Sequence, residues 1–196
     1  VEPVISNTES LQLDPRAHHR WTPVWPEARV QVKLQTPALS WSGRGYLDHN
    51  TGIEPLEESF ESWHWSRTLT STGPAILYDT VDRQGNRGCH ALHFSRDGHQ
   101  SIFDPGPYVD LPSSRWGIAR STRSQSKAAV AKTWEDTPFY ARSLISTKLL
   151  DEQVTAVHES LSLPRFTAPW VQLMLPFRMP RKSNWHRHDP GQNIAR

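Results

Sequence analysis

The chain has 196 residues, a length that favours one domain and leaves room for a small second one. Lys and Arg number 22 against 20 for Asp and Glu, and this near-balance argues against an acidic tail protein and a strongly basic nucleic-acid-binding protein. No apolar run approaches the roughly 18 residues of a membrane span. The single cysteine, Cys89, excludes a disulfide within the chain and a cysteine-based zinc site. Nine Trp, six Phe and four Tyr supply enough aromatic side chains for a core.

Short alternating segments, broken by Pro and Gly, recur along the chain. Residues 29–35 alternate strictly between apolar and polar side chains, as a half-buried strand does. Residues 39–47 are typical of a second strand, in which two glycines mark a bulge or a close backbone approach. Residues 75–81 and 89–94, separated by a loop with Gly and Asn, predict a hairpin. Further strands are predicted at residues 59–69, 101–103, 116–121, 139–146, 154–163 and 171–177.

Eight or more strands with frequent turns predict an all-β fold, an antiparallel lipocalin-like barrel or sandwich. A weaker alternative is a helix over residues 54–65, with Pro55 in its first turn. The polar, then Ala-rich residues 121–131 are predicted to form a loop. We divide the chain into a β domain, residues 1–180, and a basic polar tail, residues 181–196.

The densest group of functional side chains follows Trp41. If this segment is a strand, Tyr46 and Asp48 lie two residues apart on the same face. A carboxyl group against an aromatic wall inside a barrel loses its water, which favours the neutral form and allows it to act as a general acid. The alternative is a turn over Asp48, His49 and Asn50, in which Asp48 binds nearby backbone amides.

An upstream segment offers a second pair, because His19 and Trp21 also share a face if the chain is extended. Histidine accepts a proton near neutral pH, and tryptophan offers the best aromatic face for a cation. The alternative is an exposed polar segment on which Trp21 packs as a lid. His90 and His93 would face opposite sides of a strand, so we expect no shared metal ion there.

The string from Trp41 to Glu57, followed by Phe60 and residues 63–67, closely resembles the carotenoid 1,2-hydratase (hydroxyneurosporene synthase) family. The resemblance continues at residues 135–143, 159–163 and 174–181, and covers most of the chain. It implies a two-part, lipocalin-like all-β fold, of which this chain corresponds to the C-terminal part.

The resemblance implies hydration of the terminal carbon–carbon double bond of an acyclic carotenoid, such as neurosporene or lycopene, to a tertiary alcohol. The family's catalytic His-x-Trp matches His19 and Trp21, and its Tyr-x-Asp matches Tyr46 and Asp48. In this interpretation Asp48 supplies the proton and the rings of Trp21 and Tyr46 stabilise the carbocation. His19 positions the water and takes its proton.

The expected partners are the carotenoid, water and the N-terminal part of the family fold, with no cofactor, metal ion or nucleic acid. Because the substrate is membrane-soluble, we expect peripheral contact with the cytoplasmic side of the inner or photosynthetic membrane, helped by the basic residues 178–187. Two alternatives remain open: a lipocalin-like binding module for a lipophilic molecule, and a cyclase or isomerase on a related fold.

Overall fold

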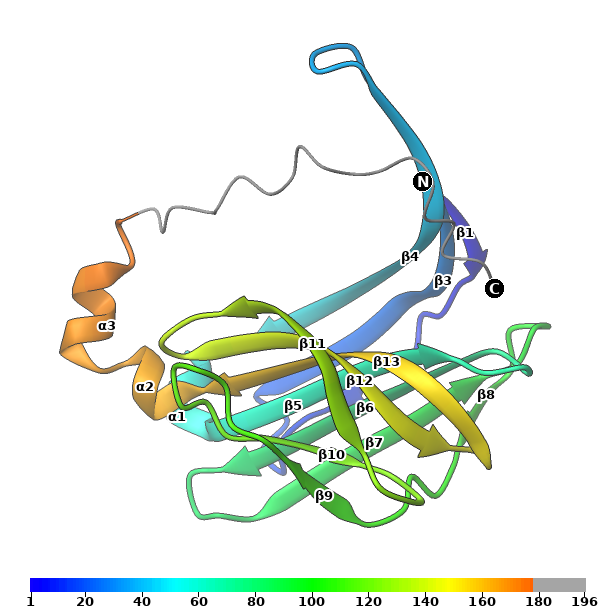
Figure 1. Cartoon of the computed structure of the whole chain (residues 1–196). Helices are drawn as coiled ribbons and strands as arrows, with labels where there is room; N and C mark the ends of the chain where they lie inside the picture. The colour runs from blue at the N-terminus through cyan, green and yellow to red at the C-terminus, as the bar shows by residue number, and fades with distance from the viewer. Residues whose placement is uncertain (178–196) are drawn as a thin grey trace.

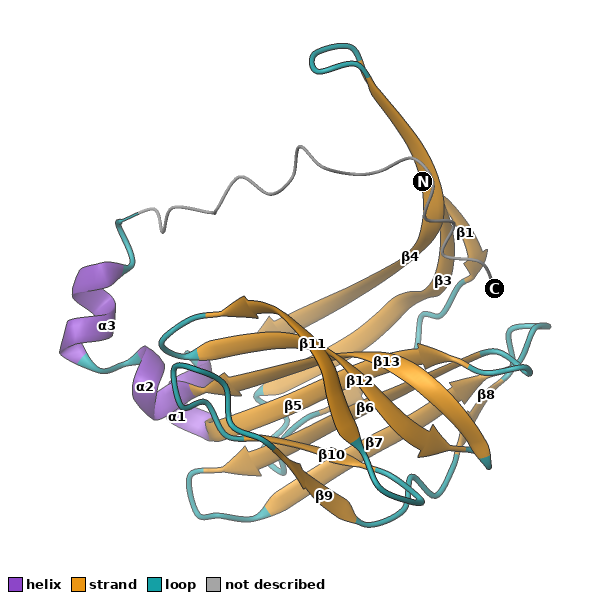
Figure 2. Cartoon of the chain, viewed as in Figure 1, coloured by secondary structure: helices purple, strands orange, loops and turns teal. Residues whose placement is uncertain are grey.

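The structure, a computed structural model, describes residues 1–177. Strands form most of it, and three short helices gather at one end (Figure 2). None of the described helices is long and apolar enough to cross a membrane. The tail predicted for residues 181–196 lies outside the described residues.

The largest sheet has seven strands, and every neighbouring pair of its strands is antiparallel. Its end strands do not pair with each other within residues 1–177, so the fold is a sandwich rather than a closed barrel. The strands follow one another in the order β11 (Ala129–Asp136), β12 (Tyr140–Leu149), β13 (Glu152–Ser162), β5 (Phe60–Leu69), β6 (Pro74–Asp82), β7 (Arg87–Phe94) and β8 (Gln100–Ile102).

The N-terminal residues form a smaller sheet around one long hairpin. Its strands β3 (His19–Leu34) and β4 (Leu39–Gly52) are antiparallel, and the short β1 (Glu2–Ile5) and β2 (Leu11–Gln12) pair with separate parts of β3. The predicted strand at residues 29–35 is only the distal half of β3. That half of the hairpin projects away from the rest of the molecule (Figure 1).

The two faces of the seven-stranded sheet are covered by different segments. The hairpin β3–β4 lies over one face, and β9 (Tyr108–Leu111) with β10 (Arg120–Arg123) lies over the other (Figure 1). Alternation along each strand sends one set of side chains to each side. The core between the hairpin and the sheet contains Trp21, Phe60, Trp65, Ile76, Tyr78, Leu92, Phe94 and Leu163. Smaller clusters on the opposite face contain Leu77, Ala91, Leu149 and Val154, and Leu111, Ile145 and Ala156.

Two predictions about helices and strands need correction. The alternative helix over residues 54–65 is reduced to the single turn α1 (Leu56–Ser59), since the alternating residues from Phe60 onward pair with β6 and β13. The predicted strand at residues 171–177 is wrong. That segment lies largely in α3 (Pro169–Met174), which follows α2 (Leu163–Phe166) and begins with a proline at a position that favours helix starts.

The predictions between residues 116 and 136 were also partly wrong. Gly117, at φ 73°, closes a turn by donating its N–H to the Ser114 carbonyl, so β10 begins only at Arg120. The predicted loop at residues 121–131 is shorter, because β11 already starts at Ala129. Most β11 side chains are exposed, which explains why alternation did not reveal this strand.

Candidate active site

Strand β4 presents Tyr46, Asp48 and Asn50 on one face. The strand runs on to Gly52, so the alternative in which residues 48–50 form a turn is wrong. Trp21 lies opposite Asn50 in the β3–β4 register, which brings its indole beside the Asp48 side chain. The hairpin pairing thus assembles three of the sequence-predicted residues.

Both hydrogen bonds to the Asp48 carboxyl group end on the same oxygen. Oδ2 accepts from the indole Nε1–H of Trp21 at 3.0 Å and from the hydroxyl of Tyr46 at 3.1 Å. In the neutral acid, Oδ1 can then carry the proton while Oδ2 accepts from both donors. The same donors stabilise the negative charge that remains after the proton leaves, as donors in an oxyanion hole do.

The two donors keep their protons over the whole physiological pH range. An indole N–H only donates. Burial, and next the negative charge of Asp48, raise the pKa of Tyr46 well above the ordinary value for tyrosine. The Tyr46 ring packs on Trp65, with ring centroids 5.1 Å apart, and this contact fixes the direction of the hydroxyl.

Asp48 lies in a groove between the hairpin and the seven-stranded sheet. This groove, which we call the aromatic groove, has a volume of about 300 Å³. Trp63 and Trp65 of β5 and Tyr78 of β6 form its floor, and the ring centroids of Trp63 and Tyr78 are 5.7 Å apart. The remaining lining residues are Tyr46, Asp48, Asn50, Arg142 and Glu159.

Trp21 itself is not part of the groove wall. It has no exposed surface, and its ring packs against Tyr78 at 5.1 Å. The structure therefore uses Trp21 as a hydrogen-bond donor to Asp48. In the floor, the half-buried Trp63 has a larger exposed fraction than Trp65 and Tyr78, which are 8% and 5% exposed. Sequence reasoning did not select these three for the site, although residues two apart on a strand share a face, as Trp63 and Trp65 do.

His19 is kept apart from Asp48. It lies opposite Gly52, four residues along β4 from Asp48, which corresponds to about 13 Å of strand. Its ring is buried against Phe60 at 5.1 Å, and its Nε2 lies 3.9 Å from Glu54 Oε1. Burial lowers the pKa of His19, which favours the neutral ring. The structure thus brings Trp21, Tyr46 and Asp48 together and places His19 next to Glu54.

The wall of the aromatic groove opposite β4 carries an ion pair that sequence reasoning did not identify. Arg142 of β12 donates through Nε to Glu159 Oε1 at 2.8 Å, and Arg142 lies 3.6 Å from Glu135 as well. Glu159 and Arg142 are directly paired residues in the β12–β13 register. The side chain of Glu159 is 18% exposed, so the pair is partly shielded from water.

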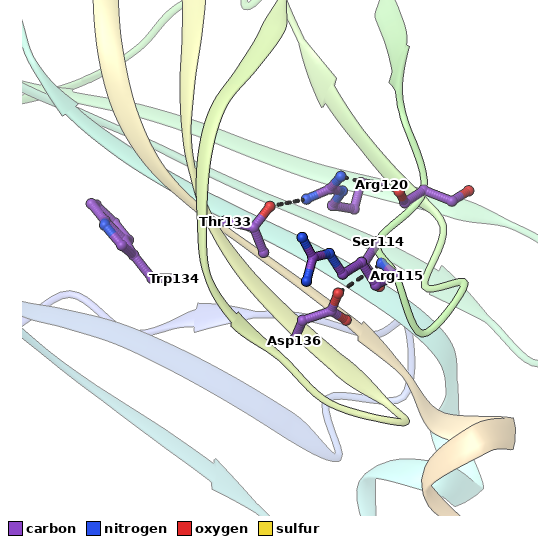
Figure 3. Close-up of a pocket in the computed structure, with 7 residues that line it drawn as sticks. Ser114, Arg115, Arg120, Thr133, Trp134 and Asp136 are labelled. Atoms are coloured by element: carbon purple, nitrogen blue, oxygen red, sulfur yellow. Dashed lines mark hydrogen bonds between the residues drawn. The ribbon is translucent and has the colours of Figure 1, made fainter. Parts of the chain in front are cut away.

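A second cavity, of about 420 Å³, lies beside β11 and is strongly polar. Figure 3 shows Arg120 directed at Thr133, and Asp136 close to the turn that contains Arg115. Arg120 is buried, and its guanidinium group donates hydrogen bonds to Thr133, Ser143 and two backbone carbonyls. These bonds connect the turn to the sheet, so we assign this cavity a structural role. Its lining residues are Ser113, Ser114, Arg115, Arg120, Thr133, Trp134 and Asp136.

The fold and the site define a β-sandwich protein whose aromatic groove holds a doubly hydrogen-bonded carboxyl group. The chain belongs to the carotenoid hydratase CrtC family, whose model matches residues 1–188. The predicted family is therefore confirmed.

Two curated relatives are similar over most of this chain. An acyclic carotenoid 1,2-hydratase of Thiocapsa roseopersicina is 51% identical over 184 residues, which make up 92% of this chain and 45% of that protein. One from Rubrivivax gelatinosus is 42% identical over 87% of this chain and 43% of its own length. The chain thus spans about half the length of the relatives that it matches.

A solved structure supports the fold. The crystal structure of an AttH candidate from Nitrosomonas europaea aligns with a TM-score of 0.54 over 83% of this chain and 59% of the other chain. At 13% identity this likeness concerns the architecture alone.

Proposed function

We propose that this chain carries the catalytic groove of an acyclic carotenoid 1,2-hydratase, in which Asp48 protonates the terminal double bond of the substrate. The observation that supports this proposal is the Asp48 carboxyl group, with both donors on Oδ2 and an aromatic floor beside it. The similarity to two proteins named acyclic carotenoid 1,2-hydratase supports the choice of substrate class.

The reaction begins with proton transfer from Asp48 to the less substituted carbon of the double bond, which leaves a tertiary carbocation. The ring of Trp63, half-buried in the aromatic floor, attracts that cation, an interaction of about 2 kcal/mol or more where water is excluded. Trp21 and Tyr46 stabilise the Asp48 carboxylate through their hydrogen bonds at the same moment. Water then adds to the cation and loses a proton, which yields the tertiary alcohol.

The size of the aromatic groove suits one end of the polyene. An adjoining hollow of about 410 Å³ shares four lining residues with the aromatic groove, so the two form a continuous surface. The shared residues are Tyr46, Trp65, Arg142 and Glu159. Sites of 300 Å³ and above typically hold a small ligand. The terminal segment of the carotenoid would occupy the groove while the rest of the chain extends beyond it. In this arrangement the terminal double bond is the one that reaches Asp48.

Incubation of the protein with lycopene or neurosporene in detergent micelles tests the proposal. Each hydration adds the mass of one water to the product, and heavy-oxygen water places its label in the new hydroxyl group. The assay is run on residues 1–196 and on the longer protein that contains them. Tight carotenoid binding without any hydrated product would identify a binding module, whereas an isomer of unchanged mass would identify a cyclase or isomerase.

We further propose that the protein meets its substrate at the surface of a membrane. The projecting half of the β3–β4 hairpin supports this, because it exposes Leu34, Leu39 and Trp41. The neighbouring Arg29 and Lys33 would favour an anionic lipid surface, at about 1 kcal/mol for each charge. Co-sedimentation with vesicles that contain phosphatidylglycerol should exceed that with neutral vesicles. If the fraction of sedimented protein is the same with phosphatidylglycerol vesicles as without any vesicles, this proposal is contradicted.

A further inference from the structure

In the hydration step the attacking water must lose a proton, and His19, the residue that the sequence suggested as its acceptor, does not line the aromatic groove. We infer that Glu159 is this base and thus a second catalytic residue, facing Asp48 from the opposite wall. The inference rests on the proposed hydratase function and adds a residue to it.

The sheet register places Glu159 at the edge of the aromatic floor. Glu159 pairs with Trp65 on β5, and Trp65 pairs in turn with Tyr78 on β6. Alternation along β13 turns Glu159 toward the groove, while its neighbours His158 and Ser160 are buried on the other face. A carbocation above Trp65 and Tyr78 would therefore lie between the Asp48 and Glu159 carboxyl groups.

Tyr78 connects the floor of the groove to β4. Its hydroxyl donates to Asn50 Oδ1 at 3.5 Å, next to Asp48 on β4. Burial raises the pKa of Tyr78, and the negative charges of Asp48 and Glu159 raise it further. The hydroxyl of Tyr78 thus lies within electrostatic reach of both carboxyl groups, one from each wall.

The charge state of Glu159 suits a base. Its partner Arg142 donates at 2.8 Å to one oxygen, Oε1, and an ion pair requires the ionised carboxylate. Burial lowers the pKa of Arg142, but the negative charge of Glu159 and its hydrogen bond to Arg142 help to outweigh it, so the pKa lies above the ordinary value for arginine. The partner of Glu159 is therefore cationic throughout the working pH range.

The complete step balances in atoms and charge. Asp48 gives its proton to one alkene carbon, and a water oxygen forms a bond to the cationic neighbouring carbon. The resulting oxonium gives one proton to the carboxylate of Glu159 and becomes the neutral alcohol. Glu159 releases this proton to solvent, and Asp48 takes one up, so the net change is one water added to one double bond.

The first test compares two substitutions on the same strand. Glu159→Gln keeps the shape of the side chain and removes the base, and Arg142 keeps Glu135 as an ion-pair partner. We expect kcat to fall about 10²-fold, with little change in KM, because general base catalysis contributes at least this much. The control Glu152→Gln lies at the other end of β13, where Glu152 binds Ser71, and should retain the activity of the unsubstituted protein. Melting curves confirm that both variants fold.

The second test uses chemical rescue. In Glu159→Ala, formate can enter the open groove and act as the missing base, so activity should rise with formate concentration. A merely structural Glu159 would not produce this effect. The acidic limb of the kcat profile against pH should also disappear in Glu159→Gln. Both measurements use the form of the protein, residues 1–196 or the longer protein, in which the unsubstituted sequence hydrates lycopene.

The outcomes separate this inference from the proposed function. If the unsubstituted protein hydrates lycopene and folded Glu159→Gln does so equally well, Glu159 is not the base and the hydratase proposal stands. Loss of activity without formate rescue, and with an unchanged pH profile, assigns Glu159 a structural role and also overturns the inference. If no form of the unsubstituted protein hydrates the substrate, both proposals fail.

Discussion

The indole Nε1–H of Trp21 and the carboxyl group of Asp48 are joined at 3.0 Å although the two residues lie 27 positions apart in the chain. The contact depends on the β3–β4 register, in which Trp21 faces Asn50, the next residue but one after Asp48. Because side chains alternate along a strand, a slip of one residue would turn Asp48 away from the groove. The hairpin pairing, rather than local sequence, therefore fixes the position of the acid.

Asp48→Asn should abolish most hydration while it preserves the fold. The amide oxygen of asparagine can still accept from Trp21 and Tyr46, but an amide does not protonate an alkene. We expect a loss of at least about 10²-fold in kcat, since general acid catalysis contributes about 10²–10⁴-fold. Product formation from lycopene, measured by mass, provides the test.

Asp48→Glu provides the matching variant, because it keeps the acid and moves it by one methylene group. Its activity should be intermediate, since a displacement of about 1 Å can cost about 10²-fold. Equal melting temperatures are the control for folding. Near-normal hydration by folded Asp48→Asn would show that the proton comes from another group.

Tyr46→Phe removes one of the two donors to Asp48 and keeps the ring that packs on Trp65. We expect kcat to fall about 10²-fold, as for the loss of one donor from an oxyanion hole. Tyr108→Phe is the control, because Tyr108 lies on β9 over the other face of the sheet and its ring contacts with Arg87 and Arg123 remain. Equal effects of the two substitutions would indicate that the Tyr46 hydroxyl does not act through Asp48.

Much of this arrangement could be predicted from sequence because it depends on local alternation. Residues two apart on a strand share a face. The predictions that Tyr46 and Asp48 share one face of their strand, and that His19 and Trp21 share one face of theirs, were therefore correct. Short strands with frequent turns also predicted the antiparallel β fold. Strand β11 was missed, because its exposed side chains do not show the alternation of a half-buried strand.

The parts that sequence could not give depend on contacts between distant strands. Arg142 and Glu159 reach the groove only through the β12–β13 register and the packing of the hairpin on the sheet. The separation of His19 from Asp48 depends on the β3–β4 register as well, with its two irregularities between Thr22 and Ala28. Sequence spacing places His19 and Asp48 in the same hairpin and leaves the distance between them undetermined.

Gly52→Ala should disturb His19 directly. A Cβ at this position would lie 2.5 Å from His19 Nδ1 and 2.8 Å from its Cε1, so the buried ring has to move. We expect a loss of about 1–3 kcal/mol in the free energy of unfolding, the usual cost of overpacking. Urea denaturation measures it. Gly43→Ala on the same strand is the control, because its nearest neighbour is the Trp41 ring at 3.7 Å, an ordinary contact. Equal stability of the two variants would contradict the crowding at His19.

The pair His64 and His158 should make stability depend on pH. The rings stack 6.0 Å apart in the buried face of the sheet, where His64 contacts Ser160 and His158 contacts the Ser121 carbonyl. Burial lowers the pKa of His64 to about 3 and that of His158 to about 4. Both rings are therefore neutral in the folded protein at pH 5, whereas in the unfolded chain they take up protons below about pH 6.5.

The sign of the effect follows from proton binding. Between about pH 6.5 and pH 4 the unfolded chain binds more protons than the folded protein, so stability is complete above this range and falls as the pH is lowered. Each histidine contributes a slope of up to about 1.4 kcal/mol per pH unit. Urea denaturation between pH 7 and pH 5 measures the slope. His64→Gln should reduce this slope by the contribution of one proton. An equal slope in His64→Gln and the unsubstituted protein would show that His64 is accessible to protons in the folded state.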